Sequence, residues 1–146
     1  MQRFSHLHVH TQYSLLDGAA NIEALYKKAM ADNMPALAIS DHGNMFGVFK
    51  FVSEAYKHRV DPEDKKSPLK VKPIVGCEFY VVEDRHKRQF TKDDKDQRFH
   101  QLLLAKDAEG YHNLVQLCSL GFIDGLYGKY PRIDKELILK YHATVN

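Results

Sequence analysis

The stretch Ala36-Leu-Ala-Ile-Ser-Asp-His-Gly43 decides the fold class. Its first residues form a short apolar run, and such a run after a helical segment predicts a strand buried on both faces, as in parallel sheets. The run stops at Asp41 and His42, two side chains that bind metals or transfer protons. Because functional residues gather at the carboxyl ends of parallel strands, we expect a site here.

Helical and strand patterns alternate on both sides of this run. The strands are predicted over residues 4–10, 36–40, 73–82 and 100–105. The predicted helices begin after the cap Asn21, near Val48, after the cap Asp107 and after the cap Asp134. This alternation predicts an α/β protein with a parallel sheet or barrel. A charged segment, 83–98, replaces the helix that should follow the third strand, and we expect it and the polar segment 60–70 to be solvated, mobile loops.

Length and composition define the class of protein. The chain has 146 residues, of which 44% are apolar, and we interpret residues 1–146 as one globular domain. The net charge of +2 excludes a nucleic-acid binder driven by charge alone, and leaves a local phosphate site open. No apolar run approaches the roughly 20 residues of a membrane helix. Two cysteines predict reduced thiols and a cytoplasmic location.

The unusual feature is the content of nine histidines. Alternation along residues 4–10 places His6, His8 and His10 on one face of the predicted strand. His8 and His10 lie at the end of that strand, and Asp17 follows in the next loop. Glu78 lies within the third strand, where a buried carboxylate needs a partner. His100 starts the fourth strand, a position that fits a shared site less well.

A mixed set of imidazoles and carboxylates favours zinc, manganese or iron, whereas calcium prefers oxygen ligands alone. Two or three such metals suit phosphoester hydrolysis, because they neutralise phosphate oxygens and activate a water molecule. Other interpretations remain open: the His8–His10 pair also fits an exposed strand face, Asp17 a turn, and Asp41-His42-Gly43 a loop or helix cap. His6 lies deeper in the strand and is predicted to support ligands through hydrogen bonds. Cys77 is interpreted as a core residue. The remaining histidines are interpreted as surface or packing residues; they are His58, His86, His112 and His142.

Two stretches, Phe4-Ser-His-Leu-His-Val-His-Thr-Gln-Tyr-Ser-Leu-Leu-Asp-Gly18 and Ala38-Ile-Ser-Asp-His-Gly-Asn-Met-Phe-Gly47, resemble the first two motifs of the PHP (polymerase and histidinol phosphatase) domain. Further stretches resemble the version in bacterial replicative DNA polymerases; they are residues 72–80, 100–114 and 130–134. The resemblance implies a distorted seven-stranded (βα) barrel, of which about four βα units are present, and a cluster of three metals held by nine ligands. The implied ligands in this chain are His8, His10, Asp17, His42, Glu78 and His100. The other three are expected beyond Asn146.

The resemblance also implies an activity. The parent protein would be a DNA-directed DNA polymerase that works on DNA with other replicase subunits, including a proofreading exonuclease. This domain would support 3′–5′ exonuclease cleavage by metal-activated water, with Asp41 orienting His42 or transferring a proton. With only part of the barrel, we expect the 146-residue chain to be weak or inactive and to self-associate through an open strand edge. The alternatives are a non-catalytic, metal-stabilised docking module for a separate exonuclease, and a phosphatase similar to histidinol phosphatase.

Overall fold

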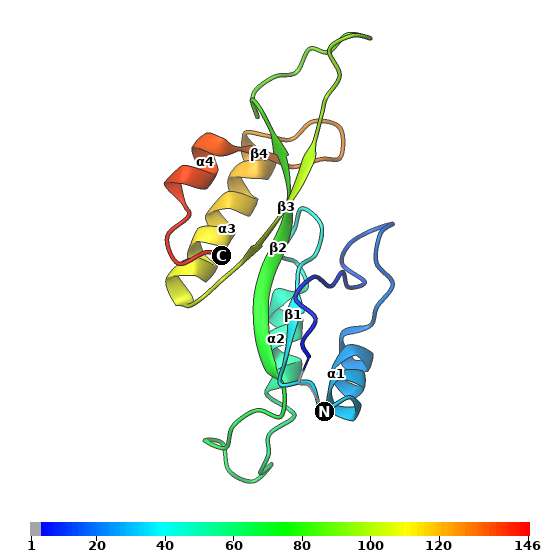
Figure 1. The fold of residues 1–146 in the computed structure, drawn as a ribbon, viewed down its shortest axis with the longest axis vertical. Coiled ribbons are helices and arrows are strands. Elements are labelled where there is room, and N and C mark those ends of the chain that lie inside the picture. Colours follow the sequence, from blue (N-terminus) through cyan, green and yellow to red (C-terminus); the bar gives the residue numbers. More distant parts are fainter. Residues whose placement is uncertain (1–3) are drawn as a thin grey trace. The chain divides into compact units, whose positions relative to one another are not determined.

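The computed structural model describes residues 4–146, so the first three residues of the expected domain lie outside the described part (Figure 1). The elements, in order, are α1 (Ile22–Ala31), β1 (Ala36–Ile39), α2 (Val48–Ala55), β2 (Lys72–Val82), β3 (Phe99–Leu104), α3 (Ala108–Ile123), β4 (Arg132–Asp134) and α4 (Lys135–Lys140). This is an α/β protein, as predicted. It divides into two compact units: the first comprises residues up to Asp41 together with Phe46–Val75, and the second comprises His42–Met45 and Gly76–Asn146.

The first unit contains α1, α2, β1 and the start of β2. Asn21 caps α1 as predicted, because its side-chain oxygen accepts a hydrogen bond from the backbone N–H of Ala24. β1 pairs in parallel with residues Lys72 to Val75 of β2. The rings of Tyr26 and Phe51, both fully buried, lie 5.0 Å apart between their centroids and join α1 to α2. The buried strand and the two amphipathic helices of this unit are therefore confirmed.

The predicted strand over residues 4–10 is not regular. Its backbone follows β1, since the carbonyl oxygens of His6 and Val9 accept hydrogen bonds from the N–H groups of Ala38 and Ser40. The acceptors are three residues apart and the donors only two. This uneven spacing, similar to a β-bulge, breaks the ladder that defines a strand. The segment is therefore an irregular chain beside β1, and the prediction of a regular strand is wrong.

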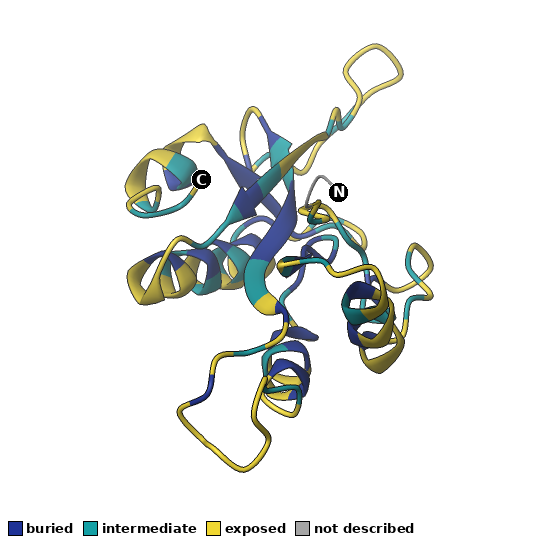
Figure 2. Ribbon diagram, turned by 60° about the horizontal axis from the view of Figure 1, so that its bottom comes forward, coloured by how far each residue is buried: buried dark blue, intermediate teal, exposed yellow. Residues whose placement is uncertain are grey.

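In the second unit, residues from Gly76 to Val82 of β2 pair with two strands of opposite direction. β3 is antiparallel to β2, and β4 is parallel to it. Helix α3 contacts β3 and β4, and α4 contacts β4. The buried core of this unit consists of Cys77, Phe79, Leu103, Leu114, Leu117, Ile133 and Leu137. Figure 2 shows the helices buried along one side and exposed along the other, as their amphipathic patterns predict.

Two features of the second unit correct the sequence predictions. The expectation of parallel strands throughout fails at β3, because no crossover helix separates it from β2 and a loop alone returns the chain antiparallel. The three-residue strand β4 was not predicted, since two of its residues are Arg132 and Asp134 and its pattern is not apolar. Both charged residues are buried and paired. The caps Asp107 and Asp134 are confirmed, each accepting a hydrogen bond from the third residue after it.

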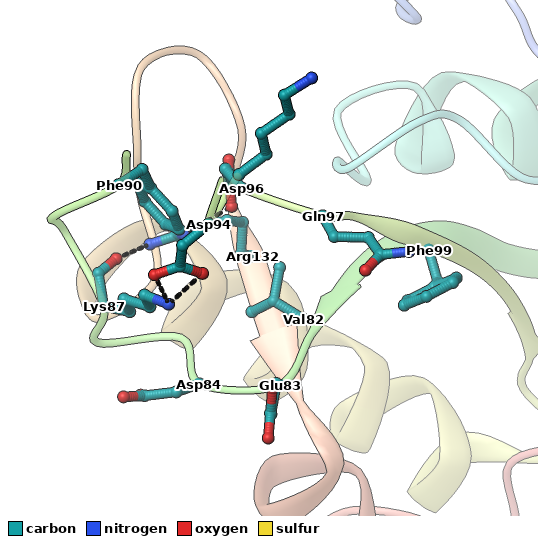
Figure 3. Close-up of a pocket in the computed structure, with 11 residues that line it drawn as sticks. Val82, Glu83, Asp84, Lys87, Phe90, Asp94, Asp96, Gln97, Phe99 and Arg132 are labelled. Atoms are coloured by element: carbon teal, nitrogen blue, oxygen red, sulfur yellow. Dashed lines mark hydrogen bonds and ion pairs between the residues drawn. The ribbon is translucent and has the colours of Figure 1, made fainter. Parts of the chain in front are cut away.

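The loop 83–98 is not simply solvated. Arg85 is 7% exposed, and its guanidinium binds the carboxylate of Asp134 at 2.8 Å. Asp96 binds Arg132, a side chain with no exposed surface, at 2.9 Å (Figure 3). Two residues of this charged loop are therefore internal anchors, which corrects the solvated interpretation for them, while the expected mobility of both loops stays a prediction. Among residues 4–146 there is no helix with the length and hydropathy of a membrane span.

Candidate metal centre

Three of the six predicted ligands meet in the second unit. One ligand atom from each of His42, Glu78 and His100 lies within 4.8 Å of the other two. Glu78 is on β2 and only 5% exposed. His42 forms an isolated parallel bridge to Glu78, and the N–H of Gly43 donates to the Glu78 carbonyl oxygen at 2.7 Å. The backbone of β2 thus holds the His42 segment directly.

His100 reaches the same place from β3. The antiparallel register pairs it with Tyr80, two residues beyond Glu78, and its Nδ1 lies 3.2 Å from Oε1 of Glu78. The prediction that Glu78 needs a partner is therefore confirmed. Two imidazoles and one buried carboxylate form a donor set that suits zinc, manganese or iron. The residues of this unit fit a divalent metal by donor type and proximity.

Tyr80 is a residue of this site that the sequence reasoning did not identify. Its ring stacks on His42, with centroids 4.1 Å apart and planes 18° from parallel. It also meets His100 edge to face, at 5.4 Å. Gly43 has φ of +69°, and a Cβ there would come within 2.9 Å of the Tyr80 ring. The signal was present, because residues two apart on a strand share a face and Tyr80 follows Glu78 at that spacing.

The other three predicted ligands belong to the first unit. His10 Nδ1 lies 2.9 Å from the Asp17 carboxylate, so the loop returns Asp17 to the end of the segment that contains the histidines. The rings of His8 and His10 are 5.3 Å apart and nearly perpendicular. The interpretation of Asp17 as a mere turn residue does not explain this pair. The structure therefore brings His10 and Asp17 together within this unit, with His8 beside them.

Asp41 is fully buried and organises the same loop. Its carboxylate accepts hydrogen bonds from the Thr11 N–H at 2.6 Å, the Thr11 hydroxyl at 2.8 Å and the Ser14 hydroxyl at 2.7 Å. Three donors from one loop on one carboxylate fix the segment between His10 and Asp17. Its predicted action on His42 is untested. The predicted supporting role of His6 is also untested; its exposed ring meets Phe4 at 4.8 Å.

The remaining candidates lie where they were expected. His86, His112 and His142 are exposed. His58, which follows α2, contacts Glu54 on that helix at 3.0 Å. Cys77 is fully buried in the core. Burial raises the pKa of the Cys118 thiol to about 11. That thiol stays protonated at neutral pH, which makes it a poor metal ligand.

Comparison with known proteins identifies the family of this chain. The model of the PHP domain family matches residues 6–145. The chain is 48% identical over 144 residues to the DNA polymerase III subunit alpha of Thermus aquaticus, covering 97% of this chain and 11% of the relative. It is 45% identical over 151 residues to the subunit of Deinococcus radiodurans, covering 99% and 10%. The chain thus spans about a tenth of the length of these relatives.

Among solved structures, a candidate metal-dependent phosphoesterase of Bifidobacterium adolescentis aligns with 79% of this chain and 31% of its own. The identity is 16% and the TM-score is 0.47. The family match spans nearly every described residue, including all six predicted ligands. This chain belongs to the PHP domain family.

Proposed function

We propose that this chain is a metal-dependent phosphodiesterase domain that removes nucleotides from the 3′ end of single-stranded DNA. The observation that supports this most directly is the His42–Glu78–His100 cluster, a mixed nitrogen and oxygen set within 4.8 Å. His10 and Asp17 form a second nitrogen and oxygen pair in the first unit. The prediction from the sequence that both sets serve one cluster of two or three metals is part of this proposal.

The proposed ligands are His8, His10, Asp17, His42, Glu78 and His100. Bound divalent metals supply positive charge for the phosphate oxygens and lower the pKa of a water molecule. The protein's own residues hold this site in order. Glu78 presents a buried carboxylate to His100. Tyr80 restricts the His42 ring, and Asp41 holds the loop between His10 and Asp17.

The relatives suggest the protein in which the domain works. They are DNA polymerase III alpha subunits, and this chain matches only a tenth of each. We propose that the domain is part of such a subunit, at its N-terminus, and that the whole protein extends primers on DNA in the cytoplasm. Other replicase subunits, including a separate proofreading exonuclease, are its proposed partners.

The test is release of nucleotides from a single strand labelled near its 3′ end, with manganese or zinc added. It is run on the 146-residue chain and on the complete product of its gene. We expect metal-dependent release by the complete product. Release by the 146-residue chain should be about a thousandfold slower, because the six proposed ligands hold only part of a three-metal cluster, and a missing metal removes several kcal/mol of transition-state stabilisation.

Glu78→Gln is the test variant and His112→Ala the control, since His112 is exposed and contacts the Ala108 carbonyl oxygen of its own helix and the neighbouring Tyr111 ring. Glu78→Gln should abolish release in the complete product, and His112→Ala should leave it unchanged. Release that persists in Glu78→Gln would overturn the proposal. Metal binding without any release would favour the alternative of a non-catalytic docking module.

A further inference from the structure

Arg98 lies at the end of a chain of ring contacts that begins at the metal centre. Its guanidinium carbon is 3.8 Å from the centroid of the Tyr130 ring. That ring meets Tyr80 edge to face at 5.1 Å, and Tyr80 stacks on His42. Arg98 also stands two residues before His100, directly before Phe99, the first residue of β3.

The charge on Arg98 is only half balanced. Its Nη1 donates to the Asp96 carboxylate, whose other oxygen accepts from Arg132 at 2.9 Å. One carboxylate thus serves two guanidinium groups, which leaves one positive charge in excess within this trio.

The two arginines have different environments. Arg132 has no exposed surface, and besides Asp96 it donates to the carbonyl oxygens of Gly125, Arg85 and Lys87. Arg98 is 27% exposed, and within residues 4–146 its only hydrogen-bond acceptor is Asp96. A guanidinium has five N–H donors. Arg132 is therefore a structural anchor, and Arg98 keeps donors available for a ligand.

The pocket in Figure 3 includes Asp96 and Arg132 of this trio, but Arg98 is not among its lining residues. Its volume is about 400 Å³, and its lining includes four carboxylates, Glu83, Asp84, Asp94 and Asp96, against three cationic side chains. Lys87 is paired there with Asp94 at 2.6 Å. That lining disfavours an anion, so the pocket does not compete with Arg98 for a phosphate.

We propose that Arg98 binds a backbone phosphate of the single DNA strand whose 3′ end reaches the metal centre. This inference rests on the proposed function and names a substrate contact for it. Guanidinium groups bind phosphate oxygens in bidentate fashion, and the stacked Tyr130 ring and Asp96 hold the Arg98 plane in place before the ligand arrives. A phosphate contact of this kind binds every base sequence alike.

The experiment measures binding of a fluorescent, phosphorothioate-linked oligothymidylate to the chain over a series of salt concentrations. Arg98→Gln should weaken binding about tenfold and reduce the slope of log affinity against log salt by about 0.7, which is the loss of one phosphate contact on a single strand. Arg98→Lys should keep the slope and bind more weakly than the parent chain, because a lysine does not reproduce the planar fork.

Lys92→Gln is the matched control. It removes one positive charge from the same loop, at an exposed residue away from β3. The inference would be overturned if the slope of log affinity against log salt were the same for Arg98→Gln and Lys92→Gln. If Arg98→Gln does not fold, an unchanged affinity in Arg98→Lys would overturn it. A loss confined to turnover of p-nitrophenyl phosphate would assign Arg98 to a small phosphomonoester instead, which also overturns it.

The two proposals fail separately in these measurements. Binding that depends on Arg98 without any 3′ release in the exonuclease assay would refute the proposed function and support the phosphate contact. Metal-dependent release with the same KM in Arg98→Gln as in the parent chain would support the proposed function and refute the phosphate contact. Circular dichroism and manganese affinity of each variant show whether the cluster itself is intact.

Discussion

Nδ1 of His100 lies 3.2 Å from Oε1 of Glu78, although the two residues stand on different strands. The cause is the direction of β3. Because β3 is antiparallel to β2, its first residues lie opposite the last residues of β2, and His100 pairs with Tyr80. A parallel β3 would place His100 at the other end of the sheet. The hairpin is thus the reason why a residue at the start of a strand joins a site at strand ends.

Glu78→Gln should lower the affinity for manganese or zinc by more than about tenfold, because the amide has no charge to offer the metal. The substitution keeps the size of the buried side chain, so a packing defect is not expected. Isothermal titration measures the affinity, and His112→Ala should match the parent chain. An unchanged affinity in Glu78→Gln would remove Glu78 from the ligand set.

His8→Ala combined with His10→Ala should reduce the metal content of protein purified without chelator. The reason is the loss of two imidazole donors, one of which pairs with Asp17. Adding Glu78→Gln to this pair tests whether the two ligand sets cooperate. Losses that do not add would indicate one shared cluster, and additive losses would indicate separate sites. Equal metal content in the parent chain and the double variant would contradict the assignment of His8 and His10.

Gly43→Ala should destabilise the fold more than Gly128→Ala. Both glycines have positive φ, +69° and +59°, so each alanine costs about 1–2 kcal/mol of backbone strain. At Gly43 the new Cβ would also lie 2.9 Å from the Tyr80 ring and 3.1 Å from Pro131, whereas nothing lies within 4 Å at Gly128. Urea unfolding gives the two costs, and their difference measures the packing at Tyr80. Equal costs would show that Tyr80 moves away freely.

The sequence predicted the local elements well, because caps and apolar periods are local signals. Asn21, Asp107 and Asp134 all cap helices as expected. The direction of β3 and the existence of β4 depend on pairing with a distant strand, which no local pattern encodes. Arg132 is an example: from the sequence a charged residue predicts a loop, and only the structure shows the partners that allow it to be buried in a short strand.

For the candidate site too, the sequence predicted what local signals encode and missed what depends on contacts between distant residues. The residue types and their positions at strand ends predicted six candidate ligands, and the structure gathers three of them in one unit and pairs two in the other. The residues that hold those ligands were harder to predict. Tyr80 and the donors around Asp41 act through contacts between residues far apart in the chain. A tyrosine in a strand is ordinary by itself, so only its stack on His42 identifies it.

Asp41→Asn should destabilise the first unit strongly, by about 3 kcal/mol or more. The carboxylate accepts three hydrogen bonds, and an amide would turn its N–H₂ group toward at least one of these donors. Ser14→Ala removes only one of the donors and should cost about 1–2 kcal/mol. Urea unfolding of both variants makes the comparison. A cost for Asp41→Asn no greater than that for Ser14→Ala would show that Asp41 does not anchor the loop.

Acid should destabilise the second unit through Asp134. Burial by itself raises the pKa of this carboxyl, but the hydrogen bond from the Leu137 N–H and the Arg85 guanidinium outweigh it and hold the pKa below its usual value. The folded state therefore binds this proton more weakly than the unfolded state does. The stabilisation is fully present above the unfolded pKa, near pH 4, and is lost as the pH falls through the lower folded value.

Asp134→Asn separates the ion pair from the helix cap, since asparagine caps a helix as well as aspartate does. At neutral pH we expect a loss of about 3–5 kcal/mol, because the buried Arg85 loses its buried carboxylate partner and keeps the exposed one of Glu136. The variant should also lose less stability than the parent chain between about pH 4 and pH 2. The matched control is Asp107→Asn, the cap of α3, whose pKa is lowered by the Gly110 N–H without any buried cation. Urea unfolding at each pH gives both comparisons. If Asp134→Asn cost no more than Asp107→Asn, the buried pair with Arg85 would add nothing beyond capping.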